Sequence, residues 1–305
     1  MISFRYHIVS LCAVVLALAL GVVLGASSLS QTMLGALSSD RADLSGQVGT
    51  LTAERDTARA QQSAADRVLA GTAPAVVAGA LRDRTVVLVA APDADPGDLD
   101  ALTGLVGQAG GRVTGTLSLT DAMLAPDRAD ALRGLVTRVL PAGVQLPSTS
   151  DVGTLTGSLL GSLVTAGRGP SSSPAEVGTA FTALADGGFL APGAAPAPAQ
   201  LALVVTGSPA PTPDAAGRAS TLARLAGGIR TGGAGTVLAA RSADGAVGTA
   251  RADQTLRGLS TVDGVGATAG RLAAVLAAAE QGAGRAGAYG SGPGLAPLPP
   301  RTPAA

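Results

Sequence analysis

The chain is poor in the residues on which catalysis and cofactor binding most often depend. Its 305 residues include one cysteine, one histidine, no tryptophan and no lysine. The single cysteine, Cys12, excludes a disulfide within the chain, and the missing lysine excludes a P-loop. His7 and Cys12 lie at the edge of and within an apolar N-terminal segment, so neither can serve the rest of the chain as base or nucleophile. We predict that the protein is not an enzyme, with no catalytic residues and no evident cofactor.

The charge balance and the scarcity of soft metal ligands argue against two further classes. Basic and acidic residues number 21 each, so the formal net charge is zero. A nucleic-acid-binding protein would show a basic surface instead, and we predict no nucleic-acid partner. A copper(I) site needs two or three thiolates or thioethers close together. No such site is evident among the soft ligands of the chain, which are Met1, Met33, Met123, His7 and Cys12.

A long apolar run is present near the N-terminus. Residues 8–26 carry no charge, and about 20 apolar residues suffice for a helix to cross a bilayer core. We therefore interpret residues 1–30 as a cytoplasmic stub and transmembrane anchor. The alternative is a cleaved signal peptide, whose apolar region is normally shorter, about 7–15 residues. Arg5 and His7 precede the run and the next charge is Asp40, so we predict a single-pass cell-membrane protein with a cytoplasmic N-terminus and an external C-terminal domain.

Residues 31–72 follow the anchor and show a seven-residue repeat. Two sets of positions, four residues apart, recur over about four heptads, a pattern that indicates a coiled coil. The apolar members of this seam include Leu37, Leu44, Val48, Leu51 and Leu69. Polar and small residues weaken its second half, and two interpretations remain. The stalk either packs as a solvated amphipathic helix on its own domain or joins copies of the chain into a homo-oligomer.

Residues 80–282 alternate between apolar runs rich in β-branched residues and amphipathic stretches, after an expected chain break at residues 71–74. The pattern predicts an α/β domain with a mostly parallel, Rossmann-like sheet, helices on both faces and some extra helices. Strands are expected at 85–90, 112–119, 201–205, 236–240 and 259–262, and helices at 98–108, 127–140, 152–166, 175–184, 214–225 and 270–281. Residues 167–174 are expected to form a loop, and the Gly- and Pro-rich residues 283–305 a disordered tail.

Four aspartates follow the first expected strand, at Asp93, Asp95, Asp98 and Asp100. The carboxyl ends of strands are where α/β sheets bind ligands, so this loop could hold a hard cation. Acidic residues are also common at helix starts, where they complement the helix dipole. We favour the second interpretation.

Three segments of the sequence resemble one known family. They are MISFRYHIVSLCAVVLALALGVVLG at the start, LRDRTVVLVAAPDAD at residues 81–95, and LSTVDGVGATAGRLAAVLAAAEQ at residues 259–281, followed by Tyr289-Gly290. These segments are similar to the actinobacterial copper transporter MctB family, the mycobacterial copper transport channel proteins. The resemblance implies an envelope protein for copper efflux, described as an outer-membrane channel, with a copper ion as its cargo. Members of the family are also linked to daughter-cell separation through regulation of peptidoglycan hydrolysis.

The resemblance also points to individual residues. Carried over by position are Arg5 and His7 at the anchor, then Arg82, Arg84, Thr261, Asp263, Arg271 and Tyr289. Each has a structural alternative, such as a strand-flanking charge, a helix cap or C-terminal packing, and we favour those alternatives. Asp263 follows a short expected strand and precedes a glycine, which predicts a position at the carboxyl edge of the sheet.

Two functions remain open on the sequence. The first is an oligomeric membrane-anchored transport assembly for copper, because one helix per chain encloses no pore. The second is a single-pass coiled-coil scaffold that binds a cell-envelope or cell-division partner and has no transport activity. Copper enters only through the resemblance.

Overall fold

The computed structural model describes residues 4–149, 151–165, 172–209, 211–292 and 294–300, apart from the side chains of residues 4–5, 25–40 and 42. The chain divides into two units, residues 1–65 and 66–305. Most of the loop expected at residues 167–174 lies outside the described residues and stays a prediction.

Helix α1, Phe4–Val77, accounts for the described part of the first unit and contributes its last turns to the second. By length and composition, Tyr6–Leu24 is the one described segment that could cross a membrane. The break expected at residues 71–74 is wrong, because α1 continues through Pro74 to Val77. Proline removes one backbone hydrogen bond, but this cost falls near the helix end, where Val77 is fully buried in the core of the second unit.

Six parallel strands form the sheet of the second unit, in the order β2-β1-β3-β4-β5-β6. Their bounds are β1 Thr85–Ala90, β2 Arg112–Ser118, β3 Leu201–Thr206, β4 Gly235–Ala240, β5 Ser260–Val262 and β6 Ala288–Tyr289. All six residues of β3 are buried, as its continuous apolar sequence predicts for a strand covered on both faces. The α/β class and the parallel sheet are confirmed.

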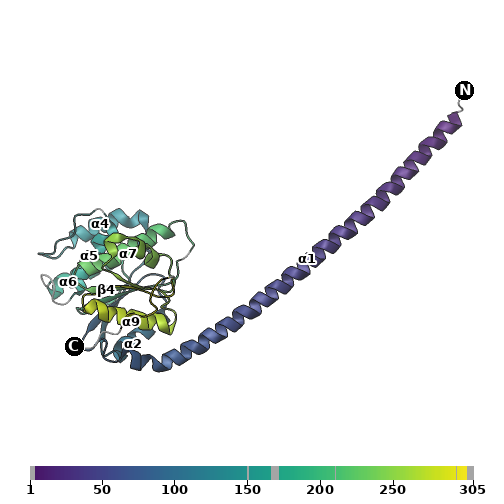
Figure 1. Ribbon diagram of the computed structural model, residues 1–305. Helices are drawn as coiled ribbons and strands as arrows, with labels where there is room; N and C mark the ends of the chain where they lie inside the picture. The colour runs from purple at the N-terminus through teal and green to yellow at the C-terminus, as the bar shows by residue number, and fades with distance from the viewer. Residues whose placement is uncertain (1–3, 150, 166–171, 210, 293, 301–305) are drawn as a thin grey trace. The chain divides into compact units, whose positions relative to one another are not determined.

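Helices cover both faces of the sheet, as expected (Figure 1). The helices α2, Pro96–Gln108, and α9, Thr268–Gly282, pack on one face together with the end of α1. The opposite face is covered by α3 Asp121–Leu124, α4 Ala129–Arg138, α5 Val152–Val164, α6 Pro174–Asp186, α7 Ala215–Thr231 and α8 Ala246–Ala252. The sequence did not predict α3 or α8, and α7 extends six residues beyond its expected end because its C-terminal half packs on α5.

The contact between α5 and α7 depends on glycine. On α5, glycine recurs every four residues at Gly153, Gly157 and Gly161. A Cβ atom at Gly157 would overlap the carbonyl oxygen of Leu225 and crowd Gly228 on α7. The two backbones therefore approach more closely than any larger residue would permit.

The disordered tail expected at residues 283–305 is wrong in its first part. The short strand β6 pairs in parallel with β5, and Tyr289 is buried. The connections β1–α2–β2 and β5–α9–β6 both use a helix on the same face of the sheet, but they cross the sheet in opposite directions. The two connections therefore have opposite hands. The composition predicted disorder, but the pairing of β6 with β5 and the buried side chain of Tyr289 hold this segment in place.

Candidate functional site

A hollow of the second unit lies beyond the carboxyl ends of β1 and β3. The chain leaves β1 toward β2 and leaves β3 in the opposite direction toward β4, so the strand order reverses between them. Ligands of open α/β sheets bind at such a switch point. The cavity has a volume of about 310 Å³, which lies at the lower end of the range of small-molecule sites, ~300–1,000 Å³.

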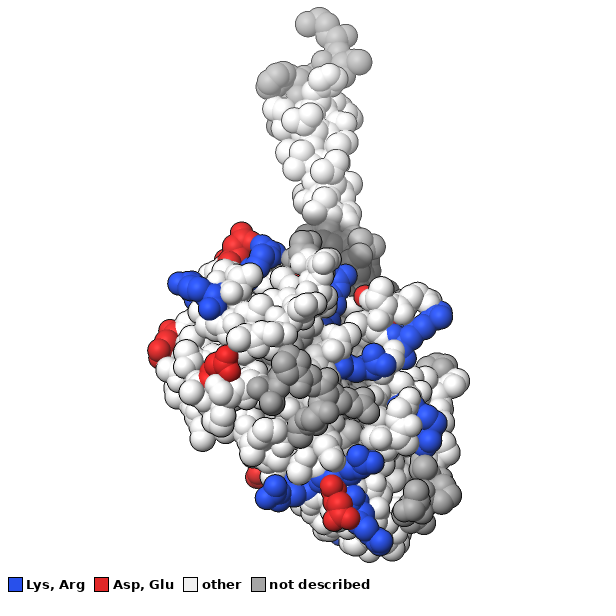
Figure 2. Space-filling view, turned by 90° about the vertical axis from the view of Figure 1, so that its left-hand side faces the viewer, with Lys and Arg blue, Asp and Glu red and all other residues white. Residues whose placement is uncertain are grey.

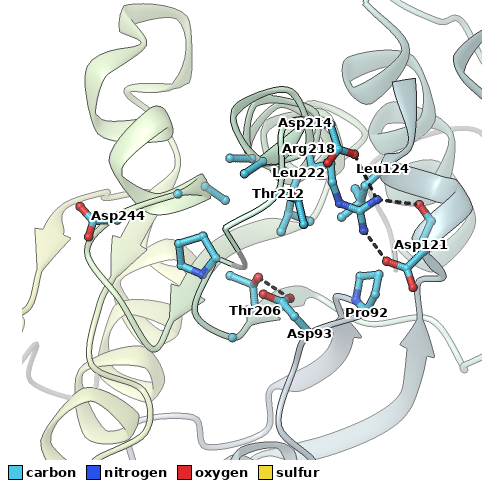
Figure 3. A pocket seen from close by; sticks show the side chains of 16 residues that line it. Pro92, Asp93, Asp121, Leu124, Thr206, Thr212, Asp214, Arg218, Leu222 and Asp244 are labelled. Carbon is cyan, nitrogen blue, oxygen red and sulfur yellow. Dashed lines mark hydrogen bonds and ion pairs between the residues drawn. The ribbon is translucent and has the colours of Figure 1, made fainter. Parts of the chain in front are cut away.

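The loops after β1 and β3 form one side of the cavity (Figure 3). The Thr206 hydroxyl donates a 2.8 Å hydrogen bond to Asp93 Oδ1. A Cβ atom at Gly207 would overlap the carbonyl oxygen of Asp93, so a glycine lets the two loops close together. Asp93 is exposed and forms no ion pair among the residues the structure describes.

A single arginine stands on another side of the cavity, between two carboxylates (Figure 3). Arg218, in the first turn of α7, forms an ion pair with Asp121 at the start of α3. A second oxygen atom, Asp214 Oδ2, lies 3.8 Å from Arg218 Nη1. The wall next to this cluster is apolar and includes the buried side chains of Leu124 and Leu222.

The remaining aspartates of the β1 loop do not form a cation site. Asp95 caps α2 by accepting the amide of Gly97 at 2.8 Å. Asp98 is 1% exposed and lies between two arginines, with Arg241 Nε at 2.6 Å and Arg271 Nη2 at 3.0 Å. These aspartates cap a helix and neutralise arginines, which agrees with the interpretation that we favoured.

Three of the residues carried over from the family meet around one arginine. Arg251 donates to Thr261 Oγ1 at 3.0 Å, to Asp263 Oδ2 at 2.8 Å and to the carbonyl oxygen of Tyr289 at 2.8 Å. Asp263 lies at the carboxyl end of β5, as predicted, but is 2% exposed. Burial acts to raise its pKa, but the Ser291 amide and hydroxyl and the Arg251 guanidinium hold the pKa of Asp263 below its ordinary value. The carboxylate is therefore a structural anchor with saturated oxygens.

The phenol of Tyr289 makes a separate buried contact. It donates a 2.5 Å hydrogen bond to Glu280 Oε2 on α9. Burial, and then the hydrogen bond and negative charge of Glu280, raise the pKa of Tyr289 from 10.0 to about 12. The two residues join the last helix to the last strand.

The other residues predicted from the sequence lie apart from the cavity. Arg271 donates to the carbonyl oxygens of Val265 and Gly266 as well as to Asp98. Arg82 and Arg84 flank the loop that leads from α1 into β1, and both are exposed. His7 is exposed on α1, while the side chain of Arg5 lies outside the described residues.

The seam residues of α1 are divided between two environments. The side chains of Leu44, Val48 and Leu51 are 60%, 62% and 63% exposed, so the described part of the first unit does not cover them. Leu69 packs against the core of the second unit, and the side chain of Leu37 is not described. Neither interpretation, packing on its own domain or joining copies of the chain, therefore follows for the whole length of the stalk.

Metal ligands are dispersed over the described part of the chain. No group of three His, Cys, Asp or Glu side chains there could hold a metal ion. Met123 is 1% exposed in the core, and Cys12 is exposed within the apolar segment of α1.

Sequence reasoning missed Arg218, Asp121 and Arg251. Asp121 and Arg251 lie in helices that the sequence did not predict, and Arg218 lies in a predicted helix but pairs with a distant residue. Asp121 and Arg218 are 97 positions apart. The only available signal was the rule that places ligands beyond strand ends, which pointed to the loop of Asp93. Asp93 lines the cavity.

The comparisons with known proteins agree over nearly the whole chain. The family model described as "Copper transport outer membrane protein, MctB" matches residues 1–300. The copper transporter MctB of Mycobacterium tuberculosis (strain ATCC 25618 / H37Rv) is 39% identical over 307 residues, covering 96% of this chain and 98% of the relative. The copper transporter MctB of Mycobacterium leprae (strain TN) is 39% identical over 317 residues, with the same coverage. This chain belongs to the MctB family of copper transport proteins.

Proposed function

We propose that the protein acts in copper efflux or homeostasis as a membrane-anchored component of an oligomeric assembly. The observation that carries the proposal is the match to curated copper transporters from end to end, which includes the anchor and the α/β unit alike. Copper is the cargo in this proposal and no resident cofactor is required.

The proposed oligomer forms through a coiled coil of α1. Leu44, Val48 and Leu51 follow one another at spacings of four and three residues, which places them on one helix face. Three large apolar side chains, each more than half exposed, gain most from contact with the same face of a second copy. Several membrane-spanning helices side by side would also enclose a path across the membrane, which one helix cannot do.

The proposed topology places the N-terminus in the cytoplasm and the α/β unit outside it. The apolar segment Tyr6–Leu24 supports a single-pass anchor. Arg5 on one side and Asp40 as the first charge on the other support the orientation. The outer-membrane location comes from the description of the family. The reversal of strand order at β1 and β3 supports the description of the external unit as Rossmann-like.

Copper content and growth under copper stress test the proposal in a strain that lacks the gene. We expect the deletion strain to accumulate copper and the full chain to restore normal content. A variant with Leu44→Asp and Leu51→Asp should fail to restore it. Thr50→Asp with Thr57→Asp, on exposed positions outside the seam, is the matched control and should restore it. Normal copper content in the deletion strain would refute the proposal.

A second variant tests whether the anchor handles the metal. His7 and Cys12 are the soft ligands exposed on the described part of the anchor. If copies of α1 gather them in the assembly, His7→Ala with Cys12→Ser should raise cellular copper without changing the amount of oligomer. Unchanged copper would place the transport path elsewhere.

A scaffold role is the second candidate, and the exposed seam favours it as well. A membrane-anchored helix with an uncovered apolar face is suited to bind a coiled-coil partner of the cell envelope or division apparatus. This role predicts unseparated, chained cells with normal copper content in the deletion strain. Rescue of separation by the full chain, but not by the Leu44→Asp, Leu51→Asp variant, would identify the scaffold as the main function.

A further inference from the structure

The cavity beyond β1 and β3 has no part in the proposed copper role, and its charge is uneven. Its lining carries the carboxylates of Asp93, Asp121, Asp214 and Asp244 and the guanidinium of Arg218. Four negative charges against one positive leave an excess of three negative charges. A hollow with one predominant sign of charge concentrates ligands of the opposite sign.

The arginine is not available to attract an anion. Arg218 is already paired with Asp121 and lies near Asp214. Its positive charge is therefore balanced within the wall of the cavity. The start of α7 contributes a partial positive charge, but this amounts to only about half an elementary charge.

Asp93, like Asp244, is a carboxylate of the lining that forms no ion pair among the described residues. Its Oδ1 atom accepts the hydroxyl of Thr206, which fixes the orientation of the carboxylate. Its Oδ2 atom has no hydrogen-bond partner among the described residues. Figure 3 shows Asp93 beside Thr206 at the cavity, across from the arginine cluster.

Other residues of the cavity lining are apolar. Leu124 and Leu222 are almost fully buried beneath the lining, so the apolar surface that a ligand can reach comes from Pro92, Pro209 and Ala219. A ligand with an apolar body would bury that body against this wall, at about 25 cal/mol per Å² of apolar area. A bare metal ion would leave the apolar wall unused.

We propose that this cavity binds a small organic amine. The ammonium group of the ligand pairs with Asp93, and its apolar body packs on Pro92, Pro209 and Ala219. The volume of about 310 Å³ limits the ligand to a molecule of small size. The inference rests on the cavity alone and is independent of copper transport.

Three probes of equal shape and different charge test the proposal on the full chain in lipid nanodiscs. Cyclohexylmethylamine is the cation, cyclohexylmethanol the neutral analogue and cyclohexanecarboxylate the anion, and ligand-observed NMR measures their binding. We expect the amine to bind about tenfold more tightly than the alcohol, as one charge-assisted hydrogen bond provides. Equal binding of the three probes, or preference for the carboxylate, would overturn the proposal.

Two variants locate the binding. Asp93→Asn keeps an acceptor for Thr206 and removes the charge, and should reduce amine binding about tenfold. Asp100→Asn removes the same charge from an exposed site outside the cavity and should leave binding unchanged. Ala219→Phe fills the cavity and should abolish binding of both amine and alcohol. Undiminished amine binding in the two cavity variants, with unchanged melting temperatures, would refute the site.

Discussion

The two units of the chain differ in the side chains that they bury and expose. On the first unit, Leu44, Val48 and Leu51 face solvent, while in the second unit Asp98 and Asp263 are almost fully buried. Among the described residues, every exposed large apolar side chain lies on α1. Buried carboxylates are stable only with partners within the same fold, whereas exposed apolar side chains are stabilised by a partner from outside it. The second unit thus pairs its buried carboxylates within its own fold, whereas the first leaves large apolar side chains exposed.

Among the variants proposed here, Arg251→Ala should cause the largest loss of stability in the second unit. The substitution leaves the carboxylate of Asp263 buried without its counter-charge and removes three hydrogen bonds. We expect a loss of about 3–5 kcal/mol in the free energy of unfolding of the second unit. Urea unfolding followed by circular dichroism measures it, with Arg257→Ala at an exposed position as the control. Equal stability of the two variants would show that the buried pair is not needed.

High pH should weaken the second unit through Tyr289. Its folded pKa of about 12 lies above the ordinary value of 10.0, so the stabilisation is complete below pH 10 and is lost as pH rises through 12. A shift of this size corresponds to roughly 2–3 kcal/mol. Urea unfolding at pH 9 and pH 11.5 should show the loss in the wild-type chain. Tyr289→Phe removes the titrating group and should show a smaller dependence; an equal dependence would assign the effect to another group.

The glycine contact between α5 and α7 gives the next effect. Gly157→Ala inserts a Cβ atom against the backbone of α7 and should cost about 1–3 kcal/mol of unfolding free energy. Gly134→Ala on α4 meets open space and should stabilise the chain by up to ~1 kcal/mol, through helix propensity. A loss of stability in Gly157→Ala and a gain in Gly134→Ala would confirm that local packing decides the effect of the added methyl group. Thermal melting of both variants provides the measurement.

A smaller effect is expected where α1 joins the second unit. The helix α9 has no cap from its own N-cap residue, and Asp66 of α1 replaces it by accepting the amide and hydroxyl of Thr268 at 2.7 and 3.0 Å. Asp66→Ala should cost about 1 kcal/mol, the usual value of a lost cap. Asp43→Ala, at an exposed position on the same helix, is the control and should have no effect. Hydrogen exchange of the first turn of α9 reports the change directly, and unchanged exchange would contradict the role of Asp66.

The smallest effect on folding should come from the seam. Leu44→Asp with Leu51→Asp should change the unfolding free energy of the second unit by no more than about 0.5 kcal/mol, because both side chains are exposed. The same variant should lower the oligomeric mass in detergent or nanodiscs. A large loss of stability without a change in mass would reverse the proposed division of roles between the units.

Local sequence patterns predicted the elements of the second unit better than its side-chain contacts. Five of the six strands were predicted, and the continuous apolar runs of β1, β3 and β4 gave the clearest signal because strands buried on both faces have no polar alternation. The edge strand β2 is partly exposed and contains polar residues. The pattern failed at β6, where two residues carry no periodicity, and at Pro74, where burial outweighed a helix-breaking residue. It correctly placed Asp93 and Asp263 beyond strand ends but could not distinguish the free carboxylate from the paired one.

The sequence by itself determined the apolar anchor, the α/β class, the parallel sheet and the family. These properties depend on local hydrophobicity and on motifs that are read along the chain. Only the tertiary structure decided that Asp263 is neutralised by Arg251, that Arg218 is balanced by Asp121, and that Asp93 lies at a cavity with a hydroxyl as its partner. Charge pairing and cavity shape depend on which distant residues the fold brings within a few ångströms, and no local pattern encodes that distance.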